Sequence, residues 1–370
     1  MIDTQEAKEF FEQWRGWSVE VLEAWGIPTN TDNRRSWNRG NPVGEMKHFT
    51  AGTGLIGTCR WGNSESNDKC SFPIVVGDRV LDGIKPMPDL VSKYMCVTAV
   101  MLSDLDRGHW HGNWTNGITV GVENRNAGPL CKKGDKFFWW AREFDVEKMG
   151  KKPVEIDGRW YEPYTAEQLV SNIWLTRLLV AAYREEEHPF DPRWIIPHSA
   201  VAWGKTDTGR AFPMNLVRGA GSTSYGPGDP SGIDPWELPW LKQYQAAPDI
   251  ALGALEEQEE QAFVDDMLAR DINYRDEDGE DEPELDDNMA TLIEGGKWST
   301  HLPKVLLGLH ELGYYVTHSP STDYTEEAKT AVWMFQKCAG KERCGNPDKI
   351  PGPKTRRALL KRLKMFQLED

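Results

Sequence analysis

The 370-residue chain lacks several features that would place it in a membrane or on a secretion route. No stretch approaches the roughly 18 consecutive apolar residues of a membrane-spanning helix, so membrane insertion is not expected. The polar, acidic N-terminus has neither the basic start nor the apolar run of a secretory signal, so any export is expected to use another route. None of the six cysteines forms a Cys-x-x-Cys pair, which argues against a four-cysteine zinc ribbon. Unpaired thiols are expected, with Cys338 and Cys344 as a pair that could join in an oxidising compartment.

The net charge of −15 comes mostly from one segment. Residues 256–287 carry 16 Asp or Glu against two Arg, whereas residues 297–370 carry 13 Lys or Arg against eight Asp or Glu. The chain shows neither the large positive field nor the groove-reading motif of a duplex-binding protein, so nucleic acid is not an expected partner. The 39% of hydrophobic residues, with 17 Trp among them, is enough for a sizeable core.

The hydrophobic pattern predicts a mixture of helices and strands up to about residue 245, which indicates an α/β or α+β unit. An amphipathic helix is predicted over residues 5–26. Thr165, followed three residues later by Gln168, forms a capping-box pattern that opens a second helix. Strands are predicted at residues 46–50, 72–76, 95–102, 117–123 and 194–197.

The remainder of the chain divides into two further parts. Residues 246–296 contain the acidic block and are too charged to fold alone, so they are interpreted as a linker rather than as an acidic recognition tail. Residues 297–370 resume a helical pattern and are predicted to form a small three-helix domain. Its helices are expected at residues 302–312, 325–338 and 353–363.

The histidines suggest a metal centre. His48 and His198 each end a predicted strand, and Asp207 follows His198 by nine residues. Two imidazoles and one carboxylate suit a catalytic zinc ion, because three protein ligands leave the fourth position open for water. Any one of these histidines taken alone is more often a core or surface residue. His109 and His111 form an alternative, because a His-Trp-His strand presents both imidazoles on one face.

Five short segments follow one another in a fixed order across residues 45–215. They are His48-Phe49-Thr50, Trp110-His111-Gly112, residues 118–124, residues 160–165 with Gln168, and His198-Ser199 with Lys205-Thr206-Asp207. Together they resemble the zinc-dependent N-acetylmuramoyl-L-alanine amidases, a group that includes phage lysozyme-type amidases and is related to peptidoglycan recognition proteins. The resemblance implies a mixed central sheet flanked by helices within a catalytic domain at residues 1–245. Residues 1–40 do not match it and receive no role.

The resemblance also implies roles for individual residues. By position, His48, His198 and Asp207 correspond to the ligands of a Zn²⁺ ion. Glu123 takes the acid/base position, and Lys205 is expected to face the scissile carbonyl. Lys205 and Asp207 lie two residues apart, so an extended segment points both side chains to the same face.

Two histidines of the His-Trp-His segment are expected to differ in role. In the resembled family the histidine after the tryptophan lines the substrate cleft, so Trp110 and His111 are expected to contact substrate, whereas His109 is expected to be structural. The C-terminal part resembles a three-helix peptidoglycan-binding domain through residues 302–313, 324–336 and 350–359. Its positive charge suits retention on an anionic wall, and a linker raises the effective substrate concentration near the catalytic unit.

These expectations combine into one functional hypothesis. The chain is expected to be a monomeric peptidoglycan hydrolase that cleaves the amide between N-acetylmuramic acid and L-alanine. The absence of a signal peptide favours a phage endolysin, made in the host cytoplasm and acting at the bacterial cell wall. Three alternatives stay open: a non-catalytic peptidoglycan-binding protein, the same fold cleaving a different peptide bond, and a virion-associated wall-penetrating amidase.

Overall fold

The computed structural model divides the chain into two compact units, Met1–Gly253 and Ala254–Asp370. The structure describes residues 2–27, 36–38, 41–52, 54–63, 72–109, 111, 115–116, 118–139, 142–156, 158–187, 189–192, 195–198, 207–208, 211–221, 234–246, 309, 326–339, 344, 354–355 and 358–359.

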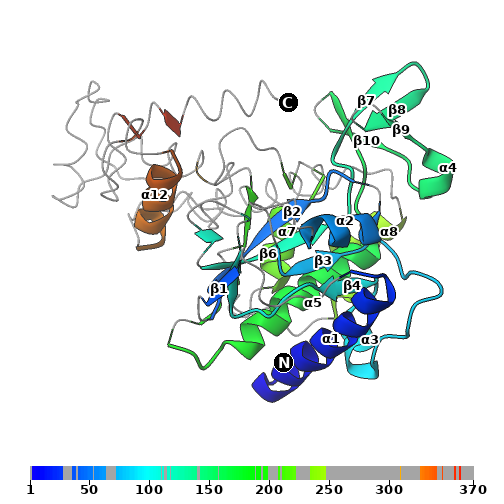
Figure 1. The fold of residues 1–370 in the computed structure, drawn as a ribbon. Coiled ribbons are helices and arrows are strands. Elements are labelled where there is room, and N and C mark those ends of the chain that lie inside the picture. Colours follow the sequence, from blue (N-terminus) through cyan, green and yellow to red (C-terminus); the bar gives the residue numbers. More distant parts are fainter. Residues whose placement is uncertain are drawn as a thin grey trace, which may run out of the picture. The chain divides into compact units, whose positions relative to one another are not determined.

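A five-stranded mixed sheet lies at the centre of the first unit (Figure 1). Its strands are β2 (Gly44–Phe49), β3 (Ile74–Val76), β4 (Ala99–Met101), β6 (Thr119–Asn124) and β12 (Ile195–Pro197). The order is β12-β2-β6-β3-β4, in which neighbouring strands run parallel except for the antiparallel pair β3 and β4. The predicted α/β class with a mixed central sheet is therefore confirmed. The predicted strand at residues 95–102 is shorter than expected: β4 begins only at Ala99, because Met95–Thr98 form an irregular bend between α3 and the strand.

Helix α5 (Ala166–Ala182) packs along this sheet and begins where the capping box predicts. The Thr165 hydroxyl accepts a hydrogen bond from the backbone N–H of Gln168 at 3.1 Å. Almost all of α5 is buried, because the helix lies among the sheet, α1 and α7. The other helices that the structure describes in this unit are α1 (Thr4–Ala24), α2 (Leu55–Gly62), α3 (Asp89–Tyr94), α4 (Val146–Met149), α7 (Met214–Gly221), the 3₁₀ helix η4 (Pro235–Glu237) and α8 (Pro239–Ala246).

Helix α1 belongs to the core of the first unit, which gives a structural role to part of residues 1–40. It packs against β4, α3 and α5. Trp14 is fully buried within the same apolar cluster as the sheet and α5, and its indole Nε1 donates a hydrogen bond to the Ala99 carbonyl at 2.8 Å. The predicted amphipathic helix over residues 5–26 is confirmed, and its apolar stripe stabilises the edge of the sheet.

We expect Trp14→Ala to lower the free energy of unfolding of the first unit by about 3–5 kcal/mol, because it leaves a large cavity and an unpaired Ala99 carbonyl. Urea denaturation followed by far-UV circular dichroism measures this loss. Trp61→Ala is the control, since Trp61 is 47% exposed and its removal should change stability much less. Equal effects of the two substitutions would contradict a core role for α1.

A second sheet, absent from the sequence prediction, lies between β6 and α5 along the chain. Its strands are β7 (Pro129–Lys133), β8 (Lys136–Trp139), β9 (Arg142–Phe144), β10 (Val154–Ile156) and β11 (Arg159–Tyr161). All its pairs are antiparallel, in the order β10-β11-β7-β8-β9, and it projects from the central sheet together with α4 (Figure 1). A small apolar cluster around Leu130, Phe144 and Met149 stabilises it.

Strands β1 (Ser36–Asn38) and β5 (Arg107–His109) form a separate antiparallel pair.

In the second unit the structure describes α12 (Glu326–Ala339), which confirms the middle helix predicted at residues 325–338. The Gln336 amide there donates a hydrogen bond to the Thr355 hydroxyl at 3.1 Å. The acidic linker and most of the other two predicted helices lie outside the described residues, so the three-part domain division stays a prediction. Within the described parts of the chain, no helix combines the length and apolar character needed to cross a bilayer.

Candidate metal centre

His48 lies near the end of β2, an interior strand of the central sheet between β12 and β6, and alternation along the strand decides where it points. The preceding residue, Lys47, is fully buried and donates hydrogen bonds to Glu45 at 3.0 Å and to Asn172 of α5 at 2.9 Å. Burial lowers the pKa of Lys47, an effect that the Glu45 charge opposes. Because successive strand residues point to opposite faces, His48 projects from the face that α5 does not cover.

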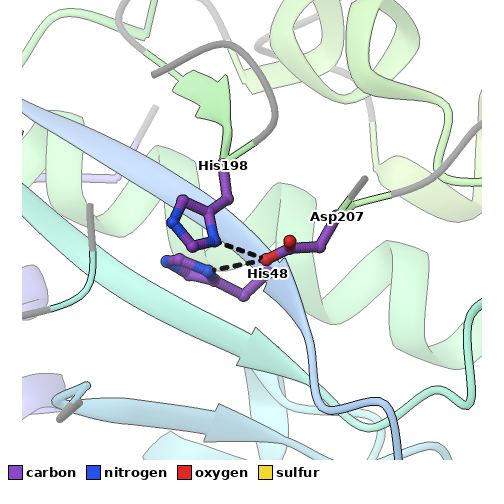
Figure 2. A group of neighbouring side chains, drawn as sticks. All are labelled: His48, His198 and Asp207. Atoms are coloured by element: carbon purple, nitrogen blue, oxygen red, sulfur yellow. Dashed lines mark hydrogen bonds and ion pairs between the residues drawn. The ribbon is translucent and has the colours of Figure 1, made fainter. Parts of the chain in front are cut away.

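The side chains of His48, His198 and Asp207 meet on this face of the sheet (Figure 2). His198 directly follows β12, which pairs with β2, and Asp207 lies nine residues further along the chain. One carboxylate oxygen of Asp207, Oδ2, lies 3.0 Å from His48 Nδ1 and 2.8 Å from His198 Nδ1. The candidate ligand atoms all lie within 4.8 Å of one another. The structure thus brings together all three residues that the sequence nominated as metal ligands.

The two imidazoles govern the ionisation of the Asp207 carboxyl. Burial alone raises its pKa, but the charge and the hydrogen bond of His198, together with those of His48, outweigh burial and hold this pKa well below its usual range. Asp207 is therefore an anion near neutral pH. A permanent carboxylate beside two imidazole nitrogens is a donor set that suits Zn²⁺.

Glu123 lies beside His48 because of the register between two parallel strands. In the ladder of β2 and β6, His48 pairs directly with Glu123. Paired residues of neighbouring strands point to the same face, so the carboxylate and the imidazole share the face that carries the metal candidates. Both side chains are nearly buried, with 3% exposure for His48 and 5% for Glu123.

His111 also borders His48. Their ring centroids lie 5.7 Å apart in an edge-to-face arrangement, and His111 Nε2 lies 3.0 Å from the Thr119 carbonyl oxygen. The ring of His111 rests on Gly121 of β6, where an added Cβ would lie 2.7 Å from the imidazole. Glycine at this position therefore allows the imidazole to approach the strand.

The alternative metal site at His109 and His111 does not form. His109 is buried and its Nε2 lies 2.5 Å from the Ser103 hydroxyl oxygen, while His111 turns onto β6. Across the described residues, the group that can hold a metal is His48, His198 and Asp207. Lys205 and Trp110 lie outside the described residues, so their predicted roles stay predictions.

Sequence reasoning missed the residues that surround the Asp207 segment. The sequence analysis named Tyr164 only as part of the segment at residues 160–165. In the structure its hydroxyl donates a hydrogen bond to the Thr208 carbonyl at 3.1 Å. It also missed a buried ionic cluster at the end of β6, in which Arg125 and Lys151 both contact Asp78 and Glu162. No spacing in the sequence signals either arrangement, because the partners are far apart along the chain.

No family model matches the chain, and no curated protein matches it in sequence. The following two are among the solved structures that are similar to it. The N-acetylmuramyl-L-alanine amidase AmiD from E. coli, in complex with anhydro-N-acetylmuramic acid-L-Ala-D-gamma-Glu-L-Lys, is 14% identical with a TM-score of 0.36, over 91% of this chain and 95% of that one. AmpDH3 from Pseudomonas aeruginosa is 14% identical with a TM-score of 0.33, over 50% of this chain and 61% of that one. Both TM-scores lie below 0.5, and these likenesses carry no argument about function.

Proposed function

We propose that the chain is a zinc-dependent peptidoglycan hydrolase that cleaves the amide between N-acetylmuramic acid and L-alanine. The observation that carries this proposal is the meeting of His48, His198 and Asp207 on one face of the sheet, with Glu123 on the adjacent strand. The reaction and the bond follow from the family that the five sequence segments resemble.

The donor set supports zinc as the cofactor. Two imidazoles and a carboxylate are typical ligands of a catalytic zinc ion, and three protein ligands leave room for a water molecule. When bound, such an ion lowers the pKa of its water to about 7 and polarises the scissile carbonyl. The Asp207 Oδ2 atom and the Nδ1 atoms of both imidazoles point toward one another, so the three donor atoms converge on one centre.

Glu123 is the proposed acid/base. Its carboxylate can accept the proton of the attacking water and then deliver that proton to the nitrogen of the leaving L-alanine. Its place beside His48 keeps it within the same small area of the sheet face. Lys205 is proposed to stabilise the negative charge that develops on the carbonyl oxygen, and Trp110 and His111 to contact the muropeptide.

The remainder of the chain is proposed to deliver this activity to the wall. Residues 297–370, with their excess of basic residues, are proposed to bind peptidoglycan, and residues 246–296 to tether them to the catalytic unit. A phage endolysin acting at the cell wall is the proposed role of the whole chain, with a virion-associated wall-penetrating enzyme as the alternative. Detection of the protein on purified phage particles would favour the virion-associated enzyme.

A digest of purified peptidoglycan, with and without a chelator, tests the proposal. We expect new L-alanine amino groups that disappear with the chelator, and no new reducing sugar ends, because the muramoyl amide and not the glycan is cut. Zinc added back after the chelator should restore release. If neither product forms while the protein still pellets with the wall, the chain is a non-catalytic binding protein; reducing ends would indicate a glycosidase instead.

A further inference from the structure

Asp207 and Thr208 lie in a turn, so contacts other than those of a helix or strand must hold their backbone. Its neighbour Thr208 is 3% exposed. The carbonyl oxygen of Thr208 accepts a hydrogen bond from the Tyr164 hydroxyl at 3.1 Å. This contact fixes the peptide next to the residue whose carboxylate joins His48 and His198.

Tyr164 contacts the same segment a second time through its ring. The aromatic rings of Tyr164 and Phe212 meet edge to face, with centroids 5.0 Å apart and an interplanar angle of 80°. Phe212 follows Asp207 by five residues, and both rings are buried. One side chain therefore secures the Asp207 segment by a hydrogen bond at Thr208 and by packing at Phe212.

Tyr164 is itself held firmly on both sides. On one side, the Tyr244 hydroxyl of α8 donates a hydrogen bond to the Tyr164 carbonyl, and the Thr165 hydroxyl donates to the Asp78 carbonyl at 3.0 Å. On the other side, the Glu162 carboxylate is buried against Arg125 and accepts a hydrogen bond from Lys151 at 2.8 Å. These anchors place the phenol before any ligand binds, which is what a positioning group requires.

The electrostatic surroundings keep the Tyr164 hydroxyl a donor. Burial raises its pKa well above the usual value, and the negative charges of Glu162, Asp207 and Glu123 raise it further. The phenol therefore keeps its proton and donates a hydrogen bond to the Thr208 carbonyl.

We propose that Tyr164 is a positioning residue for the metal ligand Asp207, holding the Asp207–Thr208 backbone so that the carboxylate meets His48 and His198. This inference rests on the metal centre of the proposed function. Tyr164 acts through Asp207, so its effect belongs to metal binding and coordination geometry. Groups that orient ligands from outside the coordination shell typically change metal affinity by about 10–100-fold.

Tyr164→Phe tests the inference, because phenylalanine keeps the ring packing on Phe212 and removes only the hydroxyl. We expect zinc affinity, measured by competition with a chromophoric chelator on the full chain, to weaken by about tenfold or more. We also expect the visible absorption spectrum of the Co²⁺-substituted protein to change, since that spectrum reports ligand geometry. Far-UV circular dichroism should match that of the wild type.

Tyr94→Phe is the matched control. Tyr94 is also buried, and its hydroxyl donates a hydrogen bond to the Glu6 carboxylate at 2.6 Å. This bond joins α3 to α1 and involves none of the three metal candidates. We expect this variant to keep wild-type zinc affinity and an unchanged Co²⁺ spectrum. If the wild type binds zinc and Tyr164→Phe matches it in affinity and spectrum, the positioning role is wrong while the metal centre stands. If the wild type binds neither ion, the metal centre and the inference both fail.

Discussion

His48→Ala and Asp207→Ala are each expected to abolish stoichiometric zinc binding and to reduce hydrolysis of peptidoglycan by more than about a hundredfold. Each substitution removes one of three converging donors, and the two that remain cannot hold the ion in an open tetrahedral site. Metal content measured by atomic emission, together with the release of L-alanine amino groups, reports both losses on the same sample.

Asp104→Ala provides the control for this pair. The Asp104 carboxylate is half exposed, pairs with Arg15 at 2.9 Å and belongs to no metal candidate group among the described residues. We expect it to keep both zinc and activity. Full hydrolysis by a His48→Ala protein that contains no zinc would remove the metal from the proposed reaction.

Glu123→Gln is expected to retain zinc but to lower kcat by about 10²–10⁴-fold. The amide is nearly the same size as the carboxylate, so the β2–β6 register beside His48 should survive, but an amide cannot accept and return a proton. Zinc content, kcat and KM on a soluble muropeptide separate loss of chemistry from loss of binding.

Glu143→Gln is the control for this substitution, because Glu143 lies on β9 and its carboxylate bonds Lys136 at the surface. Its kcat should match that of the wild type. A Glu123→Gln protein with a near-wild-type kcat would exclude Glu123 as the acid/base. A protein that loses zinc as well would instead make Glu123 a determinant of the metal centre.

The two faces of β2 explain how one strand serves both stability and the site. Glu45 and Lys47 form an ion pair within the protein, and Thr176 and Asn172 of α5 complete their hydrogen bonds. A buried charge without such partners would cost several kcal/mol. His48, one residue later, lies on the opposite face, so the strand that is fixed by α5 presents the metal candidate from a rigid position.

The sequence by itself determined the local elements whose signals are short-range. Thr165 and Gln168 start α5 because a side-chain cap satisfies a backbone N–H within the first turn. The apolar stripe of α1 follows from helical spacing, and the strand positions of His48 and Glu123 follow from runs of apolar residues. The residue types at two strand ends nominated His48, His198 and Asp207 as a metal set, and the resemblance to a family assigned them as ligands, because no local rule relates Asp207 to a histidine 159 residues away.

Only the tertiary structure decided how distant segments meet. The pairing of His48 with Glu123 depends on the register of two strands, which is set by the packing of the whole sheet. The sheet of β7–β11 escaped prediction because its aromatic run Phe137-Phe138-Trp139 does not alternate with polar residues, and its stability comes from cross-strand pairs and a shared apolar cluster. The bond from Tyr164 to Thr208 joins residues 44 positions apart, and it exists only because α5, α8 and the Asp207 segment pack together.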